Sequence, residues 1–212
     1  MTPPLEKIWL YHITHIDNLA AILVQHHLLA HNLIQPTYTN IAHQNIQTRR
    51  HTKHITCNTG GVLHDYVPFY FCRRSPMLYA IHKGTVAGYT GTQQDVIYLV
   101  ANLADLQSSR LTWVFTDGHA AMGLSDFYTD IKDLNQIDWN LMEADYWYDT
   151  VEDSDRKRRR QAEFLVHQRL PWSYIRGIAV YSEQQKQQVE TIMNNNSNTH
   201  RPNAIIRKNW YY

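Results

Sequence analysis

Apolar and polar residues alternate in patterns that predict both strands and helices along this chain. Residues 8–13 are rich in β-branched and aromatic side chains, which predicts a strand. Apolar residues then recur at helical spacing through residues 16–27, after the possible caps Thr14 and Asp17. The chain therefore opens with a predicted strand, a turn and an amphipathic helix.

The same patterns predict further elements over the rest of the chain. Strands are predicted at residues 67–71, 95–101, 112–116, 163–167, 177–181 and 204–207. Pro68 favours a sheet edge or a strand start, because proline cannot donate a ladder hydrogen bond. Ser75 and Pro76 predict a helix start, and residues 182–193 predict a longer helix that ends in a flexible tip at 194–198. The sum is an α+β fold with about six to eight strands, in a single domain over residues 1–212.

Residues 30–65 interrupt this pattern with a long polar segment. It contains a possible short helix at 41–50 and few paired apolar positions. Loops of this length in a compact domain are uncommon and usually functional. Residues 117–155 also give mixed signals, because their tryptophans and tyrosines follow no clean period. We expect these two stretches to carry function.

Composition narrows the class of protein without naming a partner. The 212 residues are 43% hydrophobic and 18% charged, which suits a packed core. The net charge of +1 gives no global argument for nucleic acid. Two cysteines make no disulfide framework, and neither a signal-peptide pattern nor a membrane-length apolar run is seen. We therefore expect a soluble, cytoplasmic protein.

The first strand and helix carry one candidate binding corner. His12 and Thr14 lie two apart, so on a strand both point to one face and could hold the hydroxyls of a ribose. The alternative is a core histidine and a helix cap. Helical spacing from Asn18 through Ala21 and Gln25 to Leu29 places these four on one face. No HExxH or CxxC motif supports a metal site, and we expect none.

Five consecutive basic residues, 156–160, precede Glu163, which opens an apolar strand. One interpretation is that cations, namely Arg156, Lys157, Arg158 and Arg159, follow a phosphate backbone while Glu163 acts on a sugar or base. A carboxylate at a ribose stabilises positive charge that develops on the sugar, and it can accept a proton from an attacking base. The alternative is a strand-end glutamate paired with one of the five cations.

Arg49 and Arg50 form a second basic pair, at the end of the predicted helix 41–50. The ordinary interpretation is a solvated pair. The functional one is a guanidinium that clamps a phosphate or polarises a base carbonyl, because arginine presents a fixed fork of donors.

Six segments lie in order along nearly the whole chain: WLYHITHIDNL at 9–19, HDYVPFYF at 64–71, RSPMLY at 74–79, TDGHAAM at 116–122, RRRQAEFLV at 158–166 and WYY at 210–212. Together they resemble DarT-type DNA ADP-ribosyltransferase toxins of the thymidine-modifying branch. The resemblance implies a split β-sheet with an NAD cleft. It also implies transfer of ADP-ribose from NAD to a base in single-stranded DNA, with release of nicotinamide, and a macrodomain antitoxin as partner.

The resemblance also implies roles for particular residues. NAD contacts fall on His12, Ile13 and Thr14, with Asn18, Ala21 and Leu29 beside them. Residues 34–52 would cover the NAD, and residues 118–162 would form the substrate-recognition loop. Arg50, or its neighbour Arg49, would activate thymine and hold NAD, and Glu163 would be the catalytic glutamate.

Three alternatives stay open on the sequence. A related transferase could act on guanine or on RNA. A nucleic-acid-binding module without chemistry could use the basic run and stacking tyrosines. A histidine-based metal hydrolase would need bound zinc. We expect the transferase, acting as a monomer without a metal.

Overall fold

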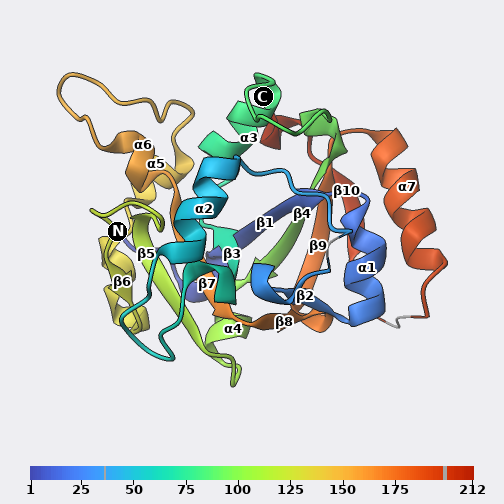
Figure 1. The fold of residues 1–212 in the computed structure, drawn as a ribbon, viewed down its shortest axis with the longest axis horizontal. Helices are drawn as coiled ribbons and strands as arrows, with labels where there is room; N and C mark the ends of the chain where they lie inside the picture. The colour runs from blue at the N-terminus through green and yellow to red at the C-terminus, as the bar shows by residue number, and fades with distance from the viewer. Residues whose placement is uncertain (36, 198–199) are drawn as a thin grey trace.

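The computed structural model describes residues 1–35, 37–197 and 200–212, and its centre is a large mixed sheet (Figure 1). Residue 198, the end of the tip predicted at 194–198, lies outside the described residues. Eight strands form this sheet: β1 (Trp9–His15), β3 (Tyr66–Tyr70), β4 (Val96–Asn102), β5 (Trp113–His119), β6 (Phe127–Tyr128), β7 (Ala162–His167), β9 (Ile175–Val180) and β10 (Asn203–Ile206). Their order is β10-β9-β4-β1-β3-β7-β5-β6, and β2 (His27–Leu29) and β8 (Arg169–Pro171) form a separate pair.

The large sheet opens between β1 and β3. β1 pairs with β4 along its whole length, but it pairs with β3 only at Tyr11–Tyr70. Beyond that point the His12 ring donates from Nδ1 to the Pro68 carbonyl at 2.8 Å. This is the split sheet that the sequence led us to expect.

The position predicted for Pro68 was wrong. The strand that contains Pro68 is not an edge strand, since β3 lies between β1 and β7. It does not start at the proline either, because β3 begins at Tyr66. The N–H and C=O of one strand residue point to the same side. The Pro68 carbonyl faces β1, so its missing N–H also faces the gap where β1 turns away. The sheet therefore loses no ladder hydrogen bond at this proline.

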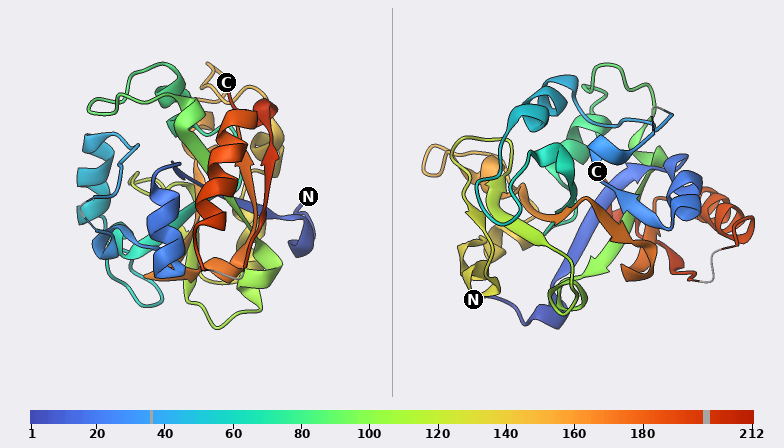
Figure 2. Two further views of the ribbon diagram at one scale, coloured as in Figure 1. Left: turned by 90° about the vertical axis from the view of Figure 1, so that its right-hand side faces the viewer. Right: turned by 60° about the horizontal axis from the view of Figure 1, so that its bottom comes forward.

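Helices cover the sheet and flank its opening. They are α1 (Asn18–Gln25), α2 (Gln44–Thr52), α3 (Pro76–His82), α4 (Leu103–Gln107), α5 (Trp139–Glu143), α6 (Arg156–Arg159) and α7 (Glu183–Asn194). α1 and α7 lie side by side, and α7 packs on β9 and β10 (Figures 1 and 2). Ser75 caps α3 by accepting from the Leu78 N–H, with Pro76 in the first turn, as predicted.

The first helix is shorter than predicted. α1 ends at Gln25 because His26 takes a left-handed conformation, with φ of 55°, and β2 starts at His27. Leu29 therefore lies on a strand and not on the helix face of Asn18 and Ala21. The described residues also form ten strands where six to eight were expected. The additional strands β2, β6 and β8 are too short to show an alternating pattern.

Candidate active site

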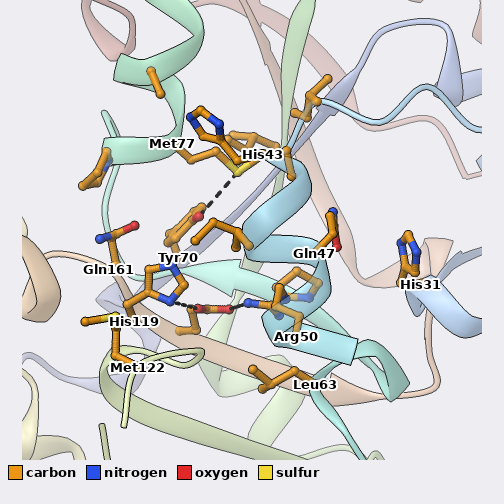
Figure 3. Close-up of a pocket in the computed structure, with 18 of the residues that line it drawn as sticks. His31, His43, Gln47, Arg50, Leu63, Tyr70, Met77, His119, Met122 and Gln161 are labelled. Carbon is orange, nitrogen blue, oxygen red and sulfur yellow. Dashed lines mark hydrogen bonds and ion pairs between the residues drawn. The ribbon is translucent and has the colours of Figure 1, made fainter. Parts of the chain in front are cut away.

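Glu163 lies in β7 at the open part of the sheet, and its carboxylate has two fixed donors. It is only 2% exposed. Arg50 Nη1 donates to Oε2 at 2.8 Å (Figure 3), and the Ala120 N–H donates to Oε1 at 3.0 Å. Two charge-assisted hydrogen bonds hold this buried carboxylate in one orientation.

An irregularity in β5 brings its backbone around Glu163. The pairing of β5 with β7 shifts register between Phe115 and His119. Within this stretch Thr116 Oγ1 accepts from the Glu163 N–H at 3.1 Å and donates to the Gly118 carbonyl at 2.6 Å. Bulges of this kind re-aim groups next to functional sites. Here the bulge turns the Ala120 N–H toward the carboxylate.

Arg50 approaches from α2, on the other side of the cavity. Its side chain is 11% exposed, and its buried Nη2 has no hydrogen-bond partner in the described structure. Arg49 is exposed and does not line the cavity. Arg50, and not Arg49, therefore reaches the cavity and Glu163, and one N–H group of Arg50 remains available to an acceptor.

A cavity of about 800 Å³ lies over this pair. This size is within the usual range of small-molecule sites. α2, β3, α3, the end of β5 and the segment that leads into β7 all contribute walls. Residues in the walls include Tyr70, Met77, His119 and Gln161 (Figure 3). The walls also include His12, Ile13, Leu29, Lys157 and Arg158.

A smaller hollow of about 330 Å³ adjoins the first along α1. His12 and Leu29 line both hollows. Asn18 and Ala21 line the smaller one, together with Gln25. The predicted NAD contacts His12, Asn18, Ala21 and Leu29 therefore lie around two adjoining hollows. Leu29 lies on β2 and not on α1.

Thr14 is placed differently from what its spacing predicted. It is 1% exposed and lines neither hollow. Its hydroxyl bonds to the Tyr38 hydroxyl at 2.6 Å and accepts from Asn18 Nδ2 at 3.0 Å. Asn18 also bonds both the N–H and the carbonyl of Thr39, at 2.8 and 2.9 Å. These side chains anchor the segment at residues 37–39.

His12 is held as a neutral ring. Burial lowers its pKa to about 4, against a smaller opposing effect of the Pro68 hydrogen bond. Since Nδ1–H donates to Pro68, Nε2 carries no proton and acts as an acceptor. The His12 ring N–H that was expected to face a ribose therefore already donates to the Pro68 carbonyl.

His119 and Tyr70 complete the surroundings of Glu163. His119 Nδ1 lies 3.8 Å from Glu163 Oε1, but it accepts from the Ala121 N–H at 3.1 Å. Burial lowers the His119 pKa, so the neutral ring carries its proton on Nε2. Tyr70 pairs with Glu163 across β3 and β7, and burial together with that carboxylate raises the pKa of its phenol. Both residues were outside the predicted site, because strand register is not visible in the sequence.

The basic run mostly binds groups of its own chain. Arg158 bonds Asp155 at 2.7 Å and Asp117 at 3.0 Å. Arg159 lies 3.2 Å from Asp138 and also pairs with Asp153. These ion pairs tie α6 to segments that precede it in the chain.

The other three residues of the run differ from one another. Arg156 donates to the carbonyls of Tyr146 and Tyr148, at 2.7 and 3.1 Å. Arg160 is 4% exposed and bonds backbone carbonyls. Lys157 is exposed, lines the cavity and has no carboxylate partner for its ammonium among the described residues. Glu163 pairs with none of the five, so the interpretation that paired it with this run was wrong.

Residues 1–35, 37–197 and 200–212 contain no group of three or more His, Cys, Asp or Glu placed to hold a metal ion. No helix in those ranges is long and apolar enough to cross a membrane.

Comparison with known proteins finds DNA ADP-ribosyltransferases as relatives of this chain. A family model described as "ssDNA thymidine ADP-ribosyltransferase, DarT" matches residues 11–212. A "DNA ADP-ribosyl transferase" of Thermus sp. (strain 2.9) is 45% identical over 207 residues, which are 98% of this chain and 97% of that protein. The structure of "Thermus sp. 2.9 DarT in complex with ADP-ribosylated ssDNA" matches with a TM-score of 0.94 at 43% identity, over 100% of this chain and 99% of that one. The structure of that protein "in complex with NAD+" matches with a TM-score of 0.88 at 40% identity, over 100% of both chains.

A more distant relative comes from Thermosipho africanus (strain H17ap60334). It is named "DNA ADP-ribosyl transferase-DNA ADP-ribosyl glycohydrolase fusion protein". It is 28% identical over 191 residues, which are 88% of this chain and 46% of that protein. The family model and the Thermus relative each cover almost the whole chain. The chain therefore belongs to the DarT family of single-stranded DNA thymidine ADP-ribosyltransferases.

Proposed function

We propose that this protein transfers ADP-ribose from NAD to thymidine bases in single-stranded DNA and releases nicotinamide. The observation that carries the proposal is the buried Glu163 carboxylate, fixed by Arg50 and the Ala120 N–H at the floor of a large cavity. The family to which the chain belongs, and relatives whose structures hold NAD or ADP-ribosylated DNA, support the same reaction.

NAD, as co-substrate, fits the two adjoining hollows. We assign its nicotinamide riboside end to the larger hollow beside Glu163 and its adenosine end to the smaller one along α1. His12, Ile13, Ala21 and Leu29 would then line the dinucleotide. Thr14 and Asn18 contribute by anchoring Tyr38 and Thr39, so that the segment at about 34–52 covers the NAD.

Glu163 acts on the ribose in this mechanism. When the bond between the ribose and nicotinamide breaks, its electron pair leaves with the pyridine ring, and positive charge builds on the sugar. The carboxylate accepts the ribose 2′-hydroxyl hydrogen bond and stabilises that charge. The thymine ring nitrogen forms the new bond to the sugar, and its proton passes to the carboxylate.

Arg50 serves both substrates. Its Nη1 holds Glu163, while its unpartnered Nη2 is free to bind an oxygen of NAD or a carbonyl of the base. A guanidinium next to a thymine carbonyl stabilises the negative charge that develops as the ring nitrogen loses its proton.

The DNA would lie along the segment at about 118–162, the substrate-recognition loop. Of the predicted contacts Arg156, Lys157, Arg158 and Arg159, Lys157 is the one we assign to a phosphate. Its charge has no carboxylate partner among the described residues and it lines the cavity. Arg158 and Arg159 would act mainly by holding the loop in shape, through their aspartate partners.

The target base is tested by intact-mass analysis of oligonucleotides incubated with the protein and NAD. Strands that differ in one base should gain one ADP-ribose unit only when they contain thymidine. Gain on a strand with guanine and no thymidine, or on RNA alone, would support the alternative transferase. No gain on any thymidine strand would rule out the proposed reaction.

We further propose a toxin that acts in the cytoplasm as a monomeric single domain without a metal, with a macrodomain glycohydrolase as its antitoxin. Both cysteines are free thiols. The Thermosipho relative, a fusion of transferase and glycohydrolase, supports such a partner. Removal of the ADP-ribose mark by a macrodomain glycohydrolase, followed by mass analysis, tests the pairing.

A further inference from the structure

An aromatic loop between α5 and α6 has no part in the chemistry described above (Figure 1). Trp147 at its centre is only 3% exposed, whereas its neighbours Tyr146 and Tyr148 are 77% and 45% exposed. Tyr146 is therefore largely open to solvent, and Tyr148, whose ring packs beside the Trp147 ring, keeps part of its surface exposed. Large aromatic rings exposed side by side commonly mark a binding surface.

The backbone of this loop is held in place on both sides. Trp147 Nε1 donates to the Tyr212 hydroxyl at 2.8 Å, and the Trp147 and Tyr148 rings lie 4.5 Å apart, between centroids. The Arg156 guanidinium donates to the carbonyls of Tyr146 and Tyr148. The two tyrosines are thus presented on an ordered backbone, which lowers the entropy that a ligand must overcome.

The loop adjoins the mouth of the reaction cavity. Asp149, directly after Tyr148, lines that cavity. The Tyr148 ring also meets the Tyr79 ring edge-on, with centroids 5.9 Å apart. Tyr79 lies on α3, whose residues Met77 and Ala80 line the cavity. A strand whose target base enters the cavity would therefore pass next to these rings.

The loop itself carries acidic residues, whereas lysines lie beside it. Asp145, Asp149 and Glu152 disfavour phosphate along the loop itself. Lys157 lies on the cavity side, and Lys83 lies 5.3 Å from the Tyr79 ring. This pattern matches single-stranded nucleic acid, whose bases stack on aromatic rings while its phosphates follow nearby cations.

We propose that Tyr146 and Tyr148 form a stacking platform for nucleotides that flank the target thymidine. The inference rests on the proposed function, and it assigns a binding surface outside the cavity. The platform would raise affinity for longer strands without touching the reacting atoms, and it would act on bases of any kind, because every base offers a ring face.

The test compares Tyr146→Ala and Tyr148→Ala with Tyr146→Phe, Tyr148→Phe and Val151→Ala. Val151 is a fully exposed residue of the same loop without a ring. Fluorescence anisotropy gives Kd, and nicotinamide release gives KM and kcat. Each is measured on a long thymidine strand and on one trimmed to the single thymidine nucleotide, which lacks the flanking bases.

Each alanine variant should weaken binding of the long strand, and raise its KM, by about fivefold or more, with kcat unchanged. The phenylalanine variants and Val151→Ala should stay within about twofold of the parent protein, and the trimmed strand should gain nothing from the tyrosines. Unchanged Kd in the alanine variants, or an equal loss on both strands, overturns the platform; unchanged Kd is also what a surface for a protein partner would give. Absence of transfer by the parent protein would count against the proposed function, while Kd still decides the platform.

Discussion

Arg50 Nη1 lies 2.8 Å from Glu163 Oε2, although 113 positions separate the two residues in the chain. The contact joins the helix α2 to the strand β7 across the cavity. Both side chains are nearly enclosed, at 11% and 3% exposure. The pair therefore holds α2 over the cavity in which we propose that the chemistry takes place.

Glu163→Gln should lower kcat for nicotinamide release with DNA by about 10²- to 10³-fold. The amide keeps the size of the side chain but loses the charge that stabilises the ribose. Circular dichroism and DNA binding should stay close to those of the parent protein. Glu143→Gln, at an exposed glutamate on α5, is the matched control and should leave kcat unchanged. Full activity of Glu163→Gln would refute the catalytic role of Glu163.

A double-mutant cycle should reveal the coupling of Arg50 with Glu163 in stability. Arg50→Met or Glu163→Met alone leaves one buried charge without its partner and should cost about 3–5 kcal/mol. The double variant removes both charges and should lose clearly less than the sum of the single losses. Urea unfolding of the four proteins measures the cycle. Additive losses would mean that the ion pair contributes little.

Gly118→Ala should disturb the site from outside the cavity. A Cβ at this position would lie 3.0 Å from Arg158 Cγ and would also meet the guanidinium, which Asp117 and Asp155 hold in place. We expect a loss of about 1–3 kcal/mol, with lower kcat because Ala120 loses its alignment on Glu163.

Gly123→Ala is the control for that change, since a Cβ there meets nothing within 4 Å. Thermal unfolding and nicotinamide release should barely change in this variant. Equal behaviour of the Gly118 and Gly123 variants would contradict the close packing of Arg158 against Gly118.

Lys157→Gln should reduce the salt dependence of DNA binding. For single strands each neutralised phosphate adds about 0.7 to the slope of log K against log salt, so the slope should fall by about that amount. Arg159→Gln should leave the slope unchanged, because Arg159 is paired with Asp138 and Asp153, and should instead lower stability. Binding titrations over a series of salt concentrations measure both. The reverse outcome would assign the phosphate to Arg159.

His12 should make the fold sensitive to mild acid. Its pKa is about 4 when folded and about 6.5 when unfolded, so the unfolded state binds more protons between these values. The His12 contribution is complete above about pH 6.5 and is lost as the pH falls toward 4, at a total cost of about 3 kcal/mol.

His12→Asn keeps a donor near the Pro68 carbonyl but does not titrate. Urea unfolding at neutral and at acid pH should therefore show a smaller loss of stability in this variant than in the parent protein. Equal pH dependence in the two proteins would show that His12 is not held neutral.

Local pattern determined most of the secondary structure. Clustered β-branched and aromatic residues fixed the positions of β1, β4, β7 and β9 within a few residues. Ser75 and Pro76 marked the start of α3, because cap and first-turn chemistry act over neighbouring residues. Glu163 stood out as a carboxylate that opens an apolar strand, and ordered motifs along the chain named the family. These features depend on near neighbours in sequence.

Only the tertiary structure decided which groups meet. Arg50, and not Arg49, contacts Glu163 in the folded chain. Thr14 bonds to Tyr38 and Asn18 and does not line either hollow. Most residues of the basic run also bind aspartates or backbone carbonyls elsewhere in the same chain. Such pairings depend on strand order, on register and on where the sheet opens between β1 and β3. Those properties arise from contacts between distant segments, and a linear pattern of apolar and polar residues carries no record of them.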